Sequence, residues 1–492
     1  MAQPKNILLL IADDLGREQT GCYGCKSIKT PNLDSLSASG SKFDMAFTST
    51  ASCSGSRTVI YTGLHTHETG SYGLNHERNG FQTFPNVETA PQVFNRLGYR
   101  TGILGKVHVG PGTAYPWEIQ EQSESRNVAH MADRASVFFQ GAQADNKPFF
   151  LTVGFVDPHR QLHVRGGFGN VQGNHDSRLQ DHLYKPEDVE VPSFLSDIPE
   201  VRQELVEYYR AITRMDQGVG RILDALDAAG ARHDTLVLFL SDNGPPFINS
   251  KTTLFEAGVR LPFLMRAPGI STPGTVNPSL VSYTDILPTF LDWAGHGHIN
   301  APEGKIQRRG RSILPILSTT TPEPGWDCVF GSHTFHEITN YWPTRYMRDC
   351  RYKYHRNVCW KLDFPFAMDL YASLSFEGMR NAKPPMIGQR RLKDYIRRPP
   401  EELYDLENDP LEVENLAGRD EARGVLKEMR EALEEWQRET RDLWLWRDGT
   451  PLVLYRTSNY AREGLRIPDR FDFDTENPST RDVEIFPLEG QK

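Results

Sequence analysis

The chain has 492 residues, a formal net charge of −9, a hydrophobic fraction of 38% and a charged fraction of 24%. This length exceeds a single compact core and indicates about two or three domains, or one large α/β domain with an appendage. The negative charge argues against a protein that binds nucleic acid or an anionic membrane, although a local basic pocket can still hold a small anion. No apolar run approaches the roughly 20 residues that cross a bilayer. We therefore expect neither nucleic acid nor a membrane among its partners.

The N-terminal run NILLLIA at residues 6–12 has the length of a signal-peptide core but also that of a buried strand. It leads directly into Asp13 and Asp14, with no small-residue cleavage pattern before them, and this favours the strand. The expected protein carries no export signal and is cytoplasmic, unless the chain is an already processed form.

Strand-like and helix-like segments then alternate along the chain. Apolar runs predict strands over residues 7–12, 101–104, 148–156 and 235–241, and helical periodicity predicts helices over 90–97 and 201–229. Buried strands separated by helices predict an α/β fold with a large, mostly parallel sheet sandwiched by helices.

The pattern changes near residue 340. Residues 346–356 read as an antiparallel strand, 403–406 precede a turn, and 421–441 read as a charged amphipathic helix. The remaining residues are rich in Pro, Arg and Asp and show little periodicity. We therefore predict a catalytic α/β domain over 1–340 and a smaller α+β domain over 341–492, with an antiparallel sheet, a packing helix and a tail.

Polar residues follow the predicted strands of the first domain. They are Asp13 and Asp14, Lys106 and His108, Asp157, His159 and Arg160, and Asp242 and Asn243. Ligands of open α/β sheets bind outside the carboxyl ends of the strands. Separate strands therefore deliver acidic, amide, imidazole and ammonium groups to one rim of the sheet.

Among these residues, Asp13, Asp14, Asp242 and Asn243 offer only oxygen ligands. Such ligands suit a hard cation, Ca²⁺ or Mg²⁺, rather than zinc. Adjacent acids at strand ends also serve as turn formers or helix caps. The repetition of the pattern at separate strand ends favours the metal site.

The six cysteines are too few for a disulfide framework in a chain of this length. Cys22 and Cys25 form a C-x-x-C pair without a second pair, which favours ordinary thiols over a zinc or redox site. Cys53 differs because it lies in a small-residue loop that opens a helix, where negative charge is favoured. Arg57, one turn further on, can face the same point. These neighbours weigh against Cys53 as merely a buried hydrophobic residue.

Taken together, these motifs resemble the type I sulfatases of the alkaline phosphatase superfamily. The segments that carry the resemblance span nearly the whole chain: NILLLIADDLG, TGILGKVHVG, SDNG and ELYDLENDPLEVENLA. The nucleophile of that family is a formylglycine made from the Cys of a C-x-P-x-R segment. Here the segment reads CSGSR, from Cys53 to Arg57, so Gly55 stands where the family has Pro or Ala.

A narrower resemblance links the chain to the N-sulfoglucosamine sulfohydrolases, or sulfamidases. It is carried by GKVHVGPGTAYP, DPHR, RMDQGVG and VFGSHTFHEIT, whereas KTTLFEAGVR looks more like general sulfatases. The resemblance implies removal of N-linked sulfate from glucosamine-type substrates, with Ca²⁺ (Mg²⁺ as the alternative) and a formylglycine at Cys53. It also implies maturation by a formylglycine-generating enzyme, a small sulfated or sulfamated saccharide as substrate, and a homodimer.

The resemblance further implies a role for each site residue. Asp13, Asp14, Asp242, Asn243 and the modified Cys53 hold the cation, and a hydroxyl of the hydrated formylglycine attacks sulfur. Arg57, Lys106 and Lys251 neutralise charge, His159 is the acid for the leaving group, and His108 is the base. Substrate selection is assigned to Asp157, Arg160, His336 and Glu337, for which a salt-bridge network is the alternative. His65 and His67 are expected to be structural, and His76 receives no role.

Other functions stay open at this point. The same metal and nucleophile suit a phosphodiesterase or phosphonate monoester hydrolase, and a different pocket shape suits an O-sulfatase for small alkyl, aryl or choline-type sulfates. If Gly55 prevents the modification of Cys53, a protein that only binds sulfated ligands is the non-catalytic alternative.

Overall fold

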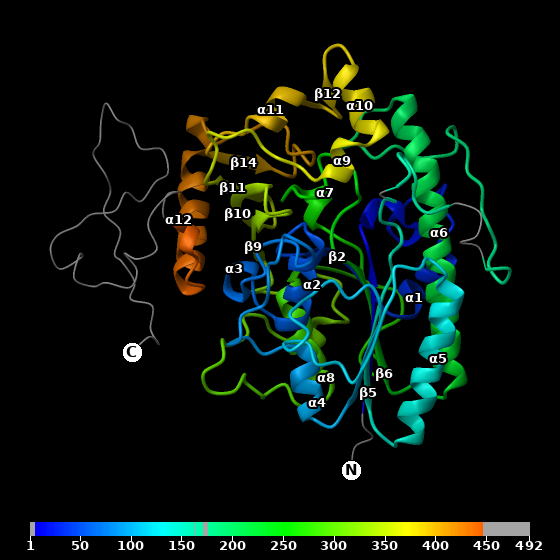
Figure 1. The fold of residues 1–492 in the computed structure, drawn as a ribbon. Coiled ribbons are helices and arrows are strands. Elements are labelled where there is room, and N and C mark those ends of the chain that lie inside the picture. The colour runs from blue at the N-terminus through cyan, green and yellow to red at the C-terminus, as the bar shows by residue number, and fades with distance from the viewer. Residues whose placement is uncertain (1–4, 162, 171–175, 446–492) are drawn as a thin grey trace.

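The computed structural model describes residues 5–161, 163–170 and 176–445 (Figure 1). Its largest element is an eight-stranded sheet with the order β4-β3-β5-β1-β6-β7-β2-β8. In chain order the strands are β1 (Asn6–Ala12), β2 (Ser41–Phe47), β3 (Arg100–Gly105), β4 (Ile119–Gln122), β5 (Phe149–Gly154), β6 (Thr235–Ser241), β7 (Phe263–Arg266) and β8 (Thr275–Ser282). Among them only β7 is antiparallel to its neighbours, β6 and β2. The predicted mostly parallel sheet is confirmed.

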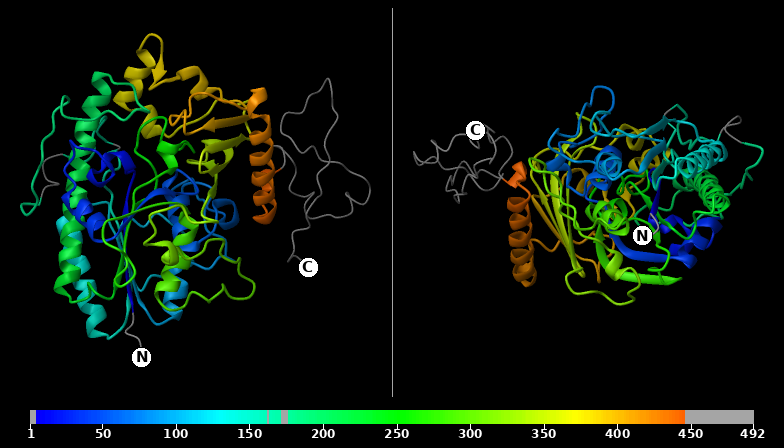
Figure 2. Two further views of the ribbon diagram at one scale, coloured as in Figure 1. Left: turned by 180° about the vertical axis from the view of Figure 1, so that it is seen from behind. Right: turned by 90° about the horizontal axis from the view of Figure 1, so that it is seen from below.

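Helices cover both faces of this sheet (Figures 1 and 2). One face carries α1 (Pro31–Ser39), α5 (Val128–Ala144) and α6 (Pro199–Ala228); the other carries α2 (Cys53–Thr62), α4 (Ala90–Arg96) and α8 (Ile286–Trp293). Because successive side chains of a strand point to opposite faces, Leu8 and Leu10 pack on the first group while Ile7 and Leu9 pack on the second. The short helices α3 (Thr66–Thr69) and α7 (Glu256–Val259) lie in connections. No helix of the described residues combines the length and the apolar character that crossing a membrane requires.

A second, antiparallel sheet has the order β14-β11-β10-β9. Its strands are β9 (Cys328–Phe335), β10 (Tyr341–Asp349), β11 (Tyr352–Asn357) and β14 (Glu401–Asp405). The amphipathic helix α12 (Arg423–Glu439) packs on this sheet through Leu426 and Leu433, against Tyr354 and Leu403. The segment between β11 and β14 holds α9 (Met368–Tyr371), α10 (Leu374–Asn381), β12 (Met386–Ile387), β13 (Arg390–Arg391) and α11 (Leu392–Ile396). The expected smaller antiparallel domain with a packing helix is confirmed.

The structure differs from the sequence prediction in the details of this second sheet. The single strand expected over 346–356 is a hairpin, because the Asp349 side chain accepts hydrogen bonds from the backbone N–H groups of Arg351 and Tyr352 and closes a turn between β10 and β11. The predicted boundary at 340 falls between β9 and β10, which pair with each other, so the second sheet starts at Cys328. The predicted tail, over 446–492, lies outside the described residues.

The topology gathers the ends of the central strands at one edge. The strands β3, β5, β1 and β6 are neighbours and run parallel. In register, Gly105 lies opposite Gly154 and Ala12 lies opposite Ser241. The loops that follow these strands therefore begin at the same level, and the residues predicted for the site follow there.

Candidate active site

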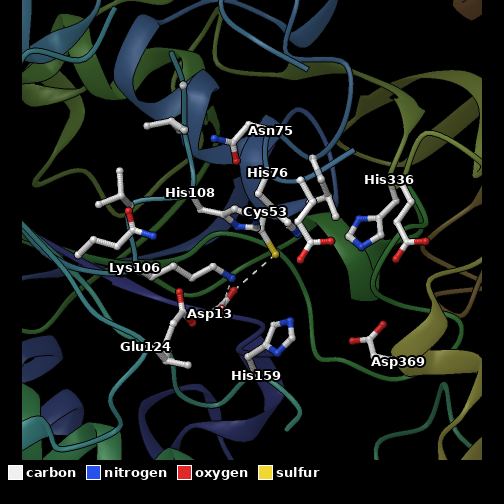
Figure 3. Close-up of a pocket in the computed structure, with 18 of the residues that line it drawn as sticks. Asp13, Cys53, Asn75, His76, Lys106, His108, Glu124, His159, His336 and Asp369 are labelled. Atoms are coloured by element: carbon white, nitrogen blue, oxygen red, sulfur yellow. Dashed lines mark hydrogen bonds and ion pairs between the residues drawn. The ribbon is translucent and has the colours of Figure 1, made fainter. Parts of the chain in front are cut away.

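A pocket of about 900 Å³ opens at this edge of the sheet (Figure 3). Its walls come from both parts of the chain. Asp13, Lys106 and His159 follow strands of the large sheet, whereas His336 and Asp369 belong to the segment that forms the second sheet. The size lies within the range of pockets that hold a small molecule.

An acidic cluster lies at the floor of the pocket, where Asp13 and Cys53 line it and Asp14 and Asp242 lie beneath. The carboxylates of Asp13, Asp14 and Asp242 and the thiol of Cys53 each place one ligand atom within 4.8 Å of all the others. The Cys53 Sγ lies 3.5 Å from Asp13 Oδ1 and 3.8 Å from Asp14 Oδ1. Every one of these side chains is buried. The structure thus brings together residues predicted from two strand ends and one helix start.

This cluster fits a hard cation. Asn243 Nδ2 donates a 2.6 Å hydrogen bond to Asp14 Oδ1, while the buried Asn243 Oδ1 has no hydrogen-bond partner among the described residues. Burial and the neighbouring Asp13 carboxylate raise the pKa of Asp242 to about 7. Buried carboxylates that repel one another are stabilised by a bound cation, and oxygen donors suit a hard one.

Cationic side chains surround the floor. Lys106 Nζ lies 2.5 Å from Asp13 Oδ2, and Arg57 Nε lies 2.8 Å from Asp242 Oδ2. Lys251 Nζ lies 2.8 Å from Asp14 Oδ2. Although burial alone would raise the pKa of Asp13, Lys106 and its other cationic neighbours hold this pKa well below its ordinary value. Each acidic residue of the cluster therefore has a cationic partner, and two of these partners, Lys106 and Lys251, also line the pocket.

The loop that leads to Cys53 is held by histidine rings. Ser49 Oγ lies 2.7 Å from His65 Nδ1. Thr50 Oγ1 lies 3.0 Å from the Nδ1 atom of His333 in β9, and Ser52 Oγ lies 3.0 Å from His336 Nδ1. Burial raises the pKa of the Cys53 thiol well above its ordinary value. The expected structural role of His65 is consistent with this contact.

Packing around residue 55 explains why this chain has glycine there. A Cβ at this position would lie 2.9 Å from the Thr50 Cγ2 atom and 3.1 Å from the Thr66 Cγ2 atom. Those distances are shorter than carbon atoms normally approach. Neighbouring methyl groups thus occupy the space into which a larger side chain at residue 55 would extend.

His159 lies beside the acidic floor. Its Nε2 is 3.1 Å from Lys251 Nζ and 3.6 Å from Asp14 Oδ2, and its Nδ1 is 2.7 Å from the Arg160 carbonyl oxygen. Since a carbonyl only accepts, Nδ1 carries the proton and Nε2 is left to accept. Burial and Lys251 lower the pKa of His159. Without a substrate beside it, the His159 ring is therefore neutral near pH 7.

His108 lies on another wall and contacts a second histidine. Its Nε2 forms a 2.7 Å hydrogen bond with His76 Nδ1, and both rings line the pocket. Burial, followed by the charge of Lys106, lowers the pKa of His108 well below its ordinary value. A neutral ring near the floor has the protonation state that a base requires.

The residues predicted to select the substrate fall into two groups. Asp157 lies outside the pocket lining, and Arg126 and Arg214 bind its carboxylate at 2.5 and 2.7 Å. Arg160 lines the pocket, but its guanidinium is bound by the Glu204 carboxylate through two contacts of 2.7 Å. Both residues therefore take part in the salt-bridge network that was the alternative.

The second group consists of His336 and Glu337, which line the pocket. Asp369 lies on the same side and was not predicted from the sequence. Its Oδ2 is 3.1 Å from Lys251 Nζ, and Asp369, Asp14 and His159 each place one ligand atom within 4.8 Å of the other two. Asp369 lies in the segment FAMDLY, which carries no motif, so no sequence signal distinguished it from an ordinary surface acid.

A family model described as Sulfatase matches residues 5–296, which is more than half of the chain. The chain belongs to the sulfatase family. This sulfatase is therefore a sulfate-hydrolysing enzyme, and its family is formylglycine-dependent and metal-binding. Cys53 and the acidic cluster are the candidates for these two requirements among the described residues.

Curated relatives agree with the family. The sulfatase is 38% identical over 467 residues to human N-sulphoglucosamine sulphohydrolase, covering 90% of this chain and 92% of that protein. It is 27% identical over 450 residues to an ulvan-active sulfatase of Formosa agariphila, covering 90% of this chain and 82% of that protein. Both alignments run through the large and the small domain.

Solved structures share the fold. One is the structure of BT4656 in complex with its substrate D-glucosamine-2-N,6-O-disulfate, with a TM-score of 0.64 and 20% identity over 89% of this chain and 99% of that one. Another is the phosphonate monoester hydrolase of Agrobacterium radiobacter, with a TM-score of 0.63 and 20% identity over 89% and 96% of the two chains. At these identities, the similarity describes the architecture alone.

Proposed function

We propose that this sulfatase removes N-linked sulfate from glucosamine-type saccharides, using a formylglycine made from Cys53. The observation that carries the proposal is the position of Cys53 at the start of α2, buried within 3.5 Å of a carboxylate on the floor of the pocket. The choice of an N-linked sulfate is supported by the 38% identity with human N-sulphoglucosamine sulphohydrolase.

The proposed cation is Ca²⁺, with Mg²⁺ as the alternative, held by Asp13, Asp14, Asp242 and Asn243 together with residue 53. Calcium takes six to eight oxygen ligands in a flexible arrangement, and these side chains converge with oxygen atoms to offer. When bound, the cation offsets the repulsion between an anionic sulfuryl group and the nucleophile.

The side chains around the floor have separate tasks in this proposal. Lys106 and Arg57 hold positive charge beside the nucleophile, and Lys251 holds it beside the sulfuryl oxygens. His159 delivers a proton from Nε2 to the leaving nitrogen. Its lowered pKa rises when the anionic substrate lies next to it, because a nearby negative charge favours the protonated ring. His108 takes a proton from the nucleophile.

The opposite wall receives the saccharide. Glu337 and Asp369 carry carboxylates that accept hydrogen bonds from sugar hydroxyl or amino groups, and His336 lies between this wall and the nucleophile loop. Asp157 and Arg160 keep their side chains in ion pairs, Arg160 in the pocket wall and Asp157 outside it. Maturation by a formylglycine-generating enzyme and assembly as a homodimer belong to the same proposal.

The test joins the modification to the reaction. The protein is produced with a formylglycine-generating enzyme, and the tryptic peptide over residues 43–57 is weighed to detect an aldehyde in place of the thiol. Sulfate release is then compared among glucosamine N-sulfate, an aryl sulfate and an aryl phosphate diester. The expected result is an aldehyde and fastest release from the N-sulfate.

Cys53→Ala is the matched control, since it removes the nucleophile and leaves the pocket in place. A modified peptide with release only from O-sulfates would replace the sulfamate by an ester substrate. Hydrolysis of the phosphate diester alone would favour the phosphonate monoester hydrolase alternative. An unmodified thiol without activity would instead favour the alternative that the protein binds sulfated ligands and does not catalyse their hydrolysis.

A further inference from the structure

His76 is a pocket residue to which neither the sequence nor the proposed function assigns a role. Its ring lies 4.7 Å from that of His108, centroid to centroid, and its Nδ1 is hydrogen-bonded at 2.7 Å to His108 Nε2. His76 belongs to the loop after α3, whereas His108 follows β3. Two segments distant in sequence thus bring two imidazoles into direct contact in the pocket (Figure 3).

The two rings differ in exposure. The Nδ1 of His108 is buried and has no hydrogen-bond partner within the described part of the chain. The charges that act on His108 include those of Lys106 and Asp13, which also act on Cys53. His76, in contrast, is an exposed residue at the pocket wall. The pair therefore runs from a buried ring nitrogen of His108 to an exposed ring at the pocket wall.

The backbone at His108 supports a fixed orientation of its ring. Its φ is 54°, in the left-handed region that residues other than glycine rarely adopt. Such a conformation persists where the surrounding structure enforces it, and it is common at functional sites. The backbone of His108 is therefore fixed by its surroundings, and its ring is bound to His76 through the 2.7 Å hydrogen bond.

We infer that His76 is a positioning and proton-transfer residue that acts through His108. His108 takes a proton from the nucleophile at Nδ1 and passes the proton on its Nε2 to His76 Nδ1; His76 then releases the proton on its own Nε2 to water. One proton enters the pair and one leaves it, and both rings end neutral in the opposite tautomer. This inference rests on the proposed function, in which His108 is the base.

The charges around the pair favour transfer outward. Burial lowers the pKa of His76, but the carboxylates of Glu77, Glu124 and Glu337 oppose this while Lys106 adds to it. For His108, burial, Lys106, His76 and Arg57 all lower the pKa, and Asp13 alone opposes them. The pKa of His108 is lowered further than that of His76, so His76 holds a proton more readily than His108 does.

The kinetic test uses His76→Gln, which keeps a hydrogen-bonding side chain but cannot carry a proton, and His76→Ala. We expect kcat for sulfate release to fall by roughly ten- to a hundredfold, with KM changed less than about twofold. Added imidazole should restore much of the kcat of His76→Ala, and the basic limb of its pH profile should follow the added base. His130→Gln, on the outer helix α5, is the matched control and should behave as the unaltered enzyme.

An unchanged kcat in His76→Gln would overturn the inference. Equal loss in both His76 variants without rescue by imidazole would also overturn it, because it would reduce His76 to a packing contact.

A second measurement separates this inference from the proposed function. Imidazole ¹⁵N spectra are recorded as a function of pH on the unaltered protein and on His76→Gln, whether or not the protein hydrolyses a sulfamate. Coupled titration of the two rings, lost in the variant, is the expected result. Independent titration of His108 and His76 would overturn the relay for any substrate. Coupled rings in a protein without sulfatase activity would instead count against the proposed function alone.

Discussion

The large sheet and the second sheet contribute to the pocket in different ways. In the large sheet, Asp13, Lys106 and Asp242 come directly after β1, β3 and β6, so the hydrogen-bonded register of the strands places them. The second sheet reaches the pocket through connections, with His336 just after β9 and Asp369 in α9. The groups proposed to act in the chemistry thus follow strands of the large sheet, the rigid side of the pocket, and the groups proposed to contact the saccharide lie on connections, its variable side.

Removal of the metal from the acidic cluster at the edge of the large sheet should have the largest effect of the changes considered. Dialysis against a calcium chelator should abolish sulfate release and lower the unfolding temperature, because the buried carboxylates lose the charge that offsets their repulsion. At a metal concentration of 100 times Kd, binding contributes about 2.7 kcal/mol. Calorimetry with and without chelator measures the difference, and Ca²⁺ should restore it better than Mg²⁺. An unfolding temperature indifferent to the chelator contradicts the metal site.

Lys251 is the point at which the two sides meet, since its Nζ contacts both Asp14 and Asp369. Replacing it with Met removes the cation and keeps the side-chain length. We expect kcat to fall roughly 10²- to 10³-fold, the size of losing one group that stabilises developing charge. The rate is measured per formylglycine, with the exposed Lys361→Met as control. A rate equal to that of the control would show that Lys251 is only structural.

Gly55 allows the nucleophile loop to be tested by packing alone. Gly55→Ala restores a residue of the family pattern, yet it should destabilise this protein by about 1–3 kcal/mol, because its Cβ meets the Thr50 methyl at 2.9 Å. Thr50→Ser removes that methyl and keeps the hydroxyl that contacts His333. The double variant should regain part of the loss in urea unfolding. If Gly55→Ala alone is neutral, the methyl contact does not explain Gly55.

Asp369→Asn changes a pocket residue of α9, in the connection between two strands of the second sheet. It should have the smallest effect on the kinetic constants. Loss of the carboxylate weakens a charge-assisted contact to the saccharide, so KM should rise about three- to tenfold, or about 1 kcal/mol, while kcat changes less. Steady-state kinetics on glucosamine N-sulfate measure both constants. Asp363→Asn, in the same segment but outside the pocket, is the control. A dominant fall in kcat would move Asp369 into the chemical step.

The sequence predicts the large sheet and its acidic edge because both depend on local order. Asp13 and Asp242 follow apolar runs, and parallel strands bring their carboxyl ends together. Asp157 follows such a run too, but Arg126 and Arg214 bind its carboxylate from positions 31 and 57 residues away. No pattern in the sequence reveals which partner a carboxylate meets. Asp369 is unpredictable for the same reason, since only tertiary packing brings α9 to Lys251.

The burial of α2 has a consequence for the order of events during synthesis. Every residue from Cys53 to Thr62 is buried, and the loop before them contacts His333 and His336, which follow about 280 residues later. A modifying enzyme that reads Cys53 together with Arg57 finds neither on the surface of the finished fold. The proposed conversion of Cys53 must therefore occur before β9 packs over this segment. A chain that folds faster than it is modified would keep the Cys53 thiol.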